Sequence, residues 1–315
     1  MQIKSQSVFC ILCCCASSLF GAMTNYLDTV MKLSPEEATK YIRSLPEDAV
    51  WQMASQAYEK GLNEYGIAVG IIGQAGPSFD WEKHPPTREK LTSLIKNHDL
   101  HPGLRAAIAA SGFDMAAGDW KFDEFLSYSD VVMVLLQDAR IPYQSKWKIP
   151  DAAARGISKR MESLVRGNLN GASLQSLDAL HDRATKATAY LTELLTKAPD
   201  TPENSLGDVS GGLMEFVRLY HGRSFPSTQA GERAAEAVRA GRDALIRVLR
   251  DPKYSAGAAK VILRRGDTIG LSDSLTKDDI TNLKSDNRLT NEDDRKLIGL
   301  WEQRVRGSKM GAKTK

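Results

Sequence analysis

The chain has 315 residues, of which 42% are hydrophobic and 26% are charged, and its formal net charge is +3. These proportions are ordinary for a soluble globular protein. Lysine and arginine are interleaved with aspartate and glutamate, so no field of one sign builds up and nucleic acid is excluded as an expected partner. Aromatic residues are sparse, whereas alanine and leucine are common in the patterned segments, which favours helices over strands.

The cysteines and the first segment of the chain point to export. All four cysteines, Cys10, Cys13, Cys14 and Cys15, lie in the first fifteen residues. The remaining chain therefore offers no disulfide, no cysteine metal ligand and no cysteine nucleophile.

Residues 1–22 read as a secretory signal peptide, with a basic start at Lys4, an apolar run over residues 8–20 and small residues at the end. The run is shorter than the about 20 residues that span a bilayer as a helix. We expect cleavage in the last part of this segment and a periplasmic or secreted protein. Two alternatives stay open: a lipid anchor on one of the cysteines at 13–15, and a true start at Met23 in the cytoplasm.

Helix signals follow along the N-terminal part. Ser34 can cap a helix in which Pro35 takes the first position and Glu37 completes a capping box. A second short helix is predicted after Pro46. The glycine-rich residues 66–76 match neither a dinucleotide-binding fingerprint nor a Walker loop, so we interpret them as a closely packed helix.

One stretch occurs twice, at residues 89–112 and 243–266. Each copy reads as a helix, a polar break with proline or glycine, a second helix and a glycine stop, which together predict a helical hairpin. Recurring hairpins are the building unit of stacked helical arrays. The matching positions, aligned without a gap, include Leu91 with Leu245, Ile95 with Leu249, Gly103 with Gly257, Ile108 with Ile262, and Gly112 with Gly266.

These hairpins resemble HEAT and armadillo repeats. The likeness lies in the leucines of the first helix, in Asn97 or Asp251 at the break, and in the alanine-rich second helix. It covers the two separated units and, more loosely, residues 34–62. Because the units are not in tandem, the resemblance implies an irregular all-α array or bundle of hairpins, HEAT-like in part. It also implies a binding surface in a groove between hairpins, most often for a protein partner.

The second half contains the longest helical pattern, residues 173–197. Its apolar positions form a heptad seam, which favours core packing in a bundle, with a dimerising coiled coil as the alternative. The seam residues are Leu177, Leu180, Ala184, Ala187, Leu191 and Leu194. The polar residues 198–212 predict a flexible linker.

Boundaries are predicted from loops and composition. The apolar run 131–136 is interpreted as a buried helix because no partner strand is near. Residues 141–150 hold two prolines and predict a loop that separates an N-terminal helical half, 23–150, from a C-terminal half, 151–306. The last helix is expected to open with a capping box at Thr290 and to end near Arg306, before a basic, disordered tail at 307–315.

Few residues suggest chemistry. His98, Asp99 and His101 form the one local cluster that could suggest a metal, but His101 stands where a helix should begin, so we interpret it as a helix-flanking residue. His181, beside the seam, is expected to be half packed and half solvated. The sequence predicts no metal and no cofactor.

Four residues are candidates for a binding surface: Trp81, His84, Trp147 and Lys148. Both tryptophans fall in predicted loops beside cations, where an exposed ring could contact a sugar or a peptide, although such rings often pack a loop onto the core.

The function expected from these features is that of an exported, non-enzymatic helical binding or scaffold protein for a protein or cell-envelope component. The alternative is a helical envelope hydrolase or lyase that acts on a polysaccharide with aspartate and glutamate as acid and base, for which Asp123 and Glu124 are candidates. Two carboxylates with separated pKa values in a deep cleft would favour the enzyme. Membrane contact is expected only through a lipid anchor.

Overall fold

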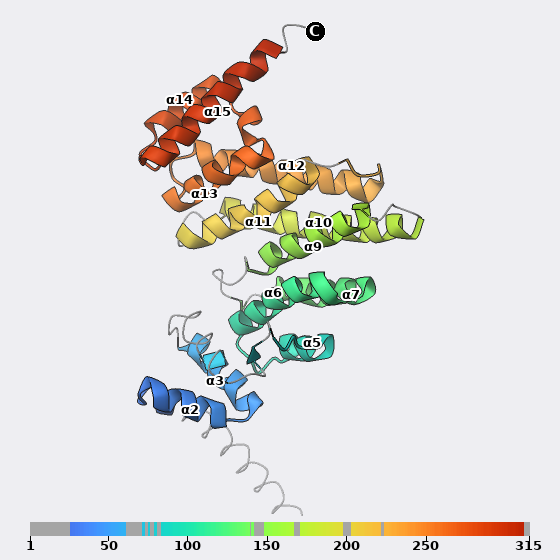
Figure 1. Cartoon of the computed structure of the whole chain (residues 1–315), viewed down its shortest axis with the longest axis vertical. Helices are drawn as coiled ribbons and strands as arrows, with labels where there is room; N and C mark the ends of the chain where they lie inside the picture. Colours follow the sequence, from blue (N-terminus) through green and yellow to red (C-terminus); the bar gives the residue numbers. More distant parts are fainter. Residues whose placement is uncertain are drawn as a thin grey trace, which may run out of the picture. The chain divides into compact units, whose positions relative to one another are not determined.

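The computed structural model describes residues 26–60, 71–72, 75, 79–80, 83–138, 140–141, 148–166, 171–197, 203–221 and 224–311. Within these ranges the chain contains helices and no strand, which confirms the all-α prediction (Figure 1). The chain divides into two compact units, one ending at Ile108 and the other beginning at Ala109. The signal-peptide segment and most of the glycine-rich residues 66–76 lie outside the described residues.

The first unit contains the short helices α2 (Pro35–Ser44), α3 (Glu47–Glu59) and α5 (Arg88–Lys96), and the start of α6 (Pro102–Asp119). The predicted capping box of α2 is present: Ser34 N donates to Glu37 Oε2 at 3.0 Å, and Glu37 N donates to the Ser34 hydroxyl. Side-chain caps therefore fix where α2 and α5 begin, whereas α3 begins after Pro46 without one. Apolar burial decides which side of each helix faces inward. The core of this unit includes Ile42, Val50, Met53, Ala54, Leu91, Ile95 and Leu104.

The second unit is larger. It contains α7 (Phe122–Leu135), α9 (Lys148–Arg166), α10 (Gly171–Lys197), α11 (Glu203–His221), α12 (Gln229–Arg250), α13 (Ala256–Gly266), α14 (Lys277–Ser285) and α15 (Glu292–Gly311), with two short 3-10 helices at Asp267–Ile269 and Leu271–Ser274. Residues 131–135 belong to α7, so the run is helical as predicted, but it is not buried throughout, because Val134 is 63% exposed.

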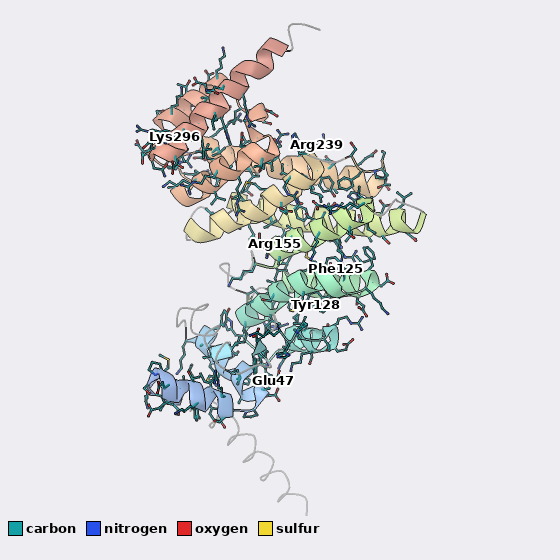
Figure 2. The ribbon with its side chains drawn as sticks, in the orientation of Figure 1. Glu47, Phe125, Tyr128, Arg155, Arg239 and Lys296 are labelled. Atoms are coloured by element: carbon teal, nitrogen blue, oxygen red, sulfur yellow. The ribbon has the colours of Figure 1, made fainter. Side chains whose placement is uncertain are left out.

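Aromatic packing joins α6 to α7. Phe125 and Tyr128 are buried on α7 (Figure 2), where their ring centroids lie 6.1 and 5.5 Å from that of Phe113. The Tyr128 hydroxyl donates to the backbone oxygen of Ala109 at 2.9 Å. Burial raises the pKa of Tyr128, so its proton stays available for this bond.

The long helix α10 is the centre of the second unit and packs against α9, α11 and α12 (Figure 1). Its predicted seam is buried from Leu177 to Leu191 with no exposed surface, and Leu194 is 7% exposed. Because helices of the same chain already cover these side chains, the seam is core packing, and the alternative of a dimer through this seam would require α10 to be uncovered.

Five expected boundaries were wrong. Residues 203–212, expected in a linker, belong to α11, because Leu206 and Val209 are fully buried and tertiary packing outweighs the low helix propensity of the glycines. Helix α9 begins at Lys148, since a proline in the first turn loses no helical hydrogen bond.

The other three differences concern one glycine in α6 and the two ends of α15. Gly112 lies inside α6 and does not stop it. Helix α15 is capped by Asn291, whose side-chain oxygen accepts from Asp294 N at 2.7 Å, rather than by Thr290. The same helix continues to Gly311, beyond the expected end at Arg306.

One corner geometry recurs after helices α5, α7, α12 and α14. An Asn or Asp side chain accepts a hydrogen bond from the backbone N–H two residues later, and its backbone oxygen accepts from the N–H three residues later. The residue at this last position is always apolar and buried. The pairs are Asn97 with Leu100, Asp138 with Ile141, Asp251 with Tyr254, and Asp286 with Leu289. We call this four-residue turn the Asx corner.

Arginine side chains satisfy carbonyls at the ends of two helices, α5 and α6. Arg105 Nε donates to the oxygen of Ile95 at 2.6 Å, near the end of α5. Arg160 donates to the oxygens of Ala116 and Trp120, at the end of α6. Because the last carbonyls of a helix have no partner within it, these side chains stabilise helix ends that the fold buries.

Two helical glycines are predicted to respond oppositely to alanine. A Cβ on Gly266 would lie 2.9 Å from the Trp301 ring, which is fully buried, whereas a Cβ on Gly299 would meet nothing within 4 Å. We expect Gly266→Ala to lower the free energy of unfolding by about 1–3 kcal/mol through overpacking. Gly299→Ala should raise it by about 0.5–1 kcal/mol through helix propensity.

Guanidinium denaturation of the two variants and the natural chain would measure both effects. The backbone at Gly266 has φ of −62°, which alanine adopts freely, so the contact alone should decide the result. Equal effects of the two substitutions would contradict the packing described for the end of α13.

Candidate functional site: a pocket between α12 and α14

The candidate surface residues from the sequence are only partly described. Trp81 and Trp147 lie outside the described residues. His84 is exposed, and its backbone N–H donates to the oxygen of Asp80 at 2.8 Å. Lys148 opens α9 and is half-buried. His84 and Lys148 belong to different compact units, so a common surface stays a prediction.

The candidate metal residues have structural roles. His101 Nδ1 accepts from Gly103 N at 3.0 Å, so His101 caps α6 as predicted, and its ring stacks on Tyr58 with centroids 5.4 Å apart. Asn97 holds the backbone N–H of Asp99 in the Asx corner. In the part of the chain that the structure describes, no three His, Cys, Asp or Glu side chains are grouped to hold a metal ion.

The candidate acid Glu124 is also engaged in helix capping. Its carboxylate accepts from the backbone N–H of Lys121 at 3.1 Å, at the start of α7. Asp123 lies beside it in the first turn, where a carboxylate stabilises the helix N-terminus.

A pocket of about 470 Å³ lies where the end of α12 approaches α14. Its floor is formed by Leu249, Leu275 and Leu283, which are almost fully buried. Its rim carries the exposed polar residues Asn282 and Asn287. We call this cavity the α12–α14 pocket.

The first charged pair of the pocket joins the two helices. Arg250 Nε and Nη2 donate to the two carboxylate oxygens of Asp279 at 2.7 and 2.8 Å. Asp279 also accepts from the backbone N–H and hydroxyl of Thr276, at 2.7 and 2.8 Å. This bidentate pair fixes α12 against the first turn of α14.

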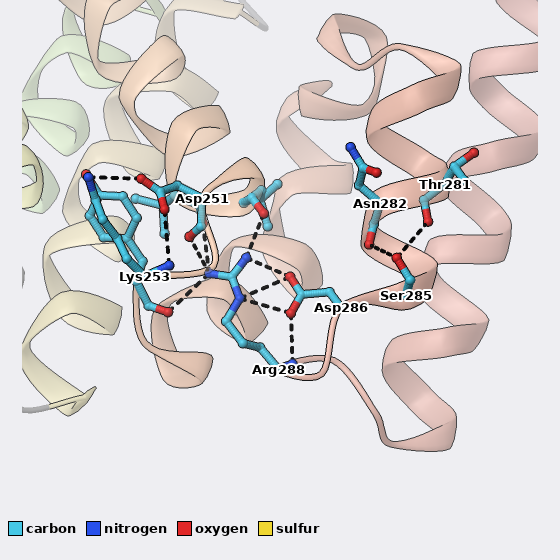
Figure 3. Close-up of polar contacts among 10 residues, drawn as sticks. Asp251, Lys253, Thr281, Asn282, Ser285, Asp286 and Arg288 are labelled. Atoms are coloured by element: carbon cyan, nitrogen blue, oxygen red, sulfur yellow. Dashed lines mark hydrogen bonds and ion pairs between the residues drawn. The ribbon is translucent and has the colours of Figure 1, made fainter.

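The second charged pair of the pocket, Arg288 with Asp286, joins the turn after α14 to the end of α12 (Figure 3). Arg288 forms an ion pair with Asp286 at 2.7 Å, and the two side chains are 10% and 8% exposed. The same guanidinium donates to four backbone oxygens at the end of α12 and in its Asx corner. These are the oxygens of Val248 at 3.1 Å, Leu249 at 2.7 Å, Asp251 at 3.0 Å and Tyr254 at 3.2 Å.

Both carboxylates of the pocket are held as anions. Burial alone would raise the pKa of Asp279, but hydrogen bonds from Arg250 and Thr276 outweigh it and lower the pKa below its usual value. The pKa of Asp286 is lowered in the same way by Arg288. Neither group can hold a proton near neutral pH, so this pair lacks the separated pKa values of an acid and a base.

Three comparisons with known proteins gave no match. No protein-family model, no curated protein and no solved structure matches it. In the described residues, no helix is both long enough and apolar enough to cross a membrane.

Sequence reasoning did not find the α12–α14 pocket. The available signal was the recurrence of Asn or Asp three residues before an apolar residue at a helix break. The long-range contact from Arg288 to α12 had no sequence signal, because it joins residues that are distant along the chain.

The role of Arg288 gives a stability prediction. Arg288→Ala leaves Asp286 buried without its partner and four carbonyls without a donor, so we expect a loss of about 3 kcal/mol or more. Arg288→Lys keeps the charge without the planar fork and should lose less.

Arg295→Ala is the matched control, because the Arg295 side chain is exposed and makes no ion pair or hydrogen bond with the described residues. It should change the free energy of unfolding by no more than about 0.5 kcal/mol. Chemical denaturation of all three variants would measure this, and similar values for Arg288→Ala and Arg295→Ala would contradict the role given to Arg288.

Proposed function

We propose that the chain is an exported, non-enzymatic helical binding or scaffold protein that engages a protein or cell-envelope component through a groove between helical hairpins. The observation that carries this proposal is the α12–α14 pocket, which lies between two hairpins. Each of its charged side chains is paired with another within the pocket: Arg250 with Asp279 and Arg288 with Asp286.

Two uncharged polar side chains of the pocket are left for a ligand. The side-chain amides of Asn282 and Asn287 make no hydrogen bond with the described residues, and each offers both a donor and an acceptor, as a peptide group does. Beneath them lies the floor of leucines. This combination suits an uncharged, peptide-like segment that carries a small aliphatic side chain.

The same charges weigh against the enzymatic alternative. A polysaccharide hydrolase or lyase needs one carboxyl group that keeps its proton and one that does not. Asp279 and Asp286 are both stabilised as anions by arginine, so this pocket offers no such pair.

The recurring Asx corners support the HEAT-like part of the proposal. Repeated hairpin joints are expected of an array of hairpins, and arrays present grooves to partners. Export rests on the pattern of residues 1–22, and a lipid anchor at the cysteines 13–15 is a second route to the envelope.

Site-specific photo-crosslinking tests the binding surface. A benzoylphenylalanine placed at Asn282 in the native host should form an adduct with one partner, whereas the same residue at Lys296, on α15, should not (Figure 2). An additional Asn287→Trp substitution, which fills the pocket, should lower the yield of the Asn282 adduct about tenfold or more, which corresponds to about 1.4 kcal/mol of binding.

Adducts of equal yield at positions 282 and 296 would contradict a specific pocket. So would an Asn282 adduct that Asn287→Trp leaves unchanged. Thermal unfolding of each variant beforehand would ensure that a lost adduct reflects the pocket and not the fold.

Export is tested by the intact mass of the protein in fractions of the native host. We expect a chain cleaved near Ser18 to Ala22 in the periplasm or medium, or one with a diacyl or triacyl addition on a cysteine. A chain that starts at Met23 in the cytoplasm would overturn the export part and leave the pocket untouched.

A further inference from the structure

His181 is a buried titratable side chain at the crossing of three helices. It lies on α10, has no exposed surface, and packs beside the end of α11 and the start of α12. Its ring lies 5.7 Å from the ring of Tyr220 and 5.2 Å from that of Phe225, measured between centroids. The sequence predicted a half-solvated histidine, which was wrong because these aromatic rings exclude water from it.

The two ring nitrogens have different surroundings. Nδ1 lies 2.6 Å from the Tyr220 hydroxyl, and burial raises the pKa of Tyr220, so this hydroxyl keeps its proton and can donate it to Nδ1. Nε2 is buried and has no hydrogen-bond partner in the described residues. It faces the first turn of α12, where a Cβ built on Gly231 would lie 3.4 Å away.

The start of α12 is tied to α10 on either side of His181. Thr228 caps α12 by accepting from Gly231 N at 3.1 Å, and its hydroxyl donates to Asp178 at 2.5 Å. Arg233, one turn further along α12, pairs with Asp182 at 2.9 Å. Asp178, His181 and Asp182 share one face of α10, so the three contacts act on the same short segment.

Protonation of His181 would be unfavourable in this position. The added charge would be buried near the positive end of the α12 dipole. The added proton would go to Nδ1 and would displace the hydrogen bond that the Tyr220 hydroxyl donates there. The neighbouring charged or titratable groups are Asp178 and Asp182 on α10, Tyr220 on α11, and Glu232 and Arg233 on α12. Glu232 accepts from Ser227, Asp178 is bonded to Thr228, and Asp182 is paired with Arg233.

Burial lowers the pKa of His181 from its usual value, and the opposing attraction of Asp178 and Asp182 is smaller. When the chain is unfolded or residues 224–231 are detached, His181 has a pKa of about 6.5 and binds a proton below that pH. In the closed form it stays neutral to a lower pH. The closed form is therefore fully favoured above about pH 6.5 and loses stability as the pH falls from there toward the lowered pKa.

We propose that His181 is an acid-sensitive latch that holds residues 224–231 and the first turn of α12 on α10 at neutral pH and releases them on acidification. Release exposes the Phe225 ring and unties the Thr228 cap, while α10 and the rest of α12 keep their other packing. The device belongs to the fold of the second unit and does not depend on the proposed binding function.

Hydrogen exchange measured by mass spectrometry on the full chain tests the latch. After correction for intrinsic rates, peptides covering residues 224–235 should lose protection between pH 7.5 and pH 5.0. The expected loss is up to about tenfold for each pH unit that separates 6.5 from the lowered pKa of His181. Peptides from α13 serve as the internal reference and should not change. His181→Gln should abolish the pH response, and His98→Gln, at an exposed histidine of the first unit, should keep it.

A natural chain whose 224–235 protection is the same at both pH values would overturn the latch, as would a His181→Gln variant that keeps the response. If His181→Gln fails to fold, NMR titration of the His181 ring in the natural chain decides the question. Its midpoint must lie below about 6.5, and the loss of protection must begin near pH 6.5, above that midpoint. A midpoint at or above that value would refute the proposal.

Discussion

The fold depends on how the ends of its helices are satisfied. The last carbonyls of every α-helix lack partners within the helix, and a chain built from many short helices buries several such ends. Here two devices meet this need. The Asx corner turns the backbone in four residues and anchors it with a buried apolar side chain. In addition, Arg105, Arg160 and Arg288 donate to backbone oxygens at the ends of α5, α6 and α12 respectively.

The α12–α14 pocket is a consequence of these devices. The corner after α14 places Arg288 against the end of α12, and the cap of α14 places Asp279 against Arg250. The two helices are thus held by polar contacts at two points, and side chains between those points do not close the space. The cavity between them is therefore lined by two pairs of opposite charges together with neutral amides and leucines.

The sequence predicted features that are local and missed those that depend on distant residues. The cap at Ser34, the helix-flanking role of His101 and the seam of α10 follow from spacing within one or two turns, and the structure contains each of them. The helical start of α11 did not follow, because its glycines have low helix propensity and only the burial of Leu206 and Val209 outweighs it. His181 was misplaced for the same reason, since the rings of Tyr220 and Phe225 come from elsewhere in the chain.

The Asx corner has a consequence for how such a chain can change over evolutionary time. It specifies only one residue able to accept a side-chain hydrogen bond and one apolar residue three positions later, while the flanking helices require little more than apolar residues at helical spacing. Very different sequences satisfy these conditions equally well. Hairpins of this kind can therefore diverge until pairwise identity is lost while their joints keep the same geometry, and their kinship would then be read from the turns rather than from the helices.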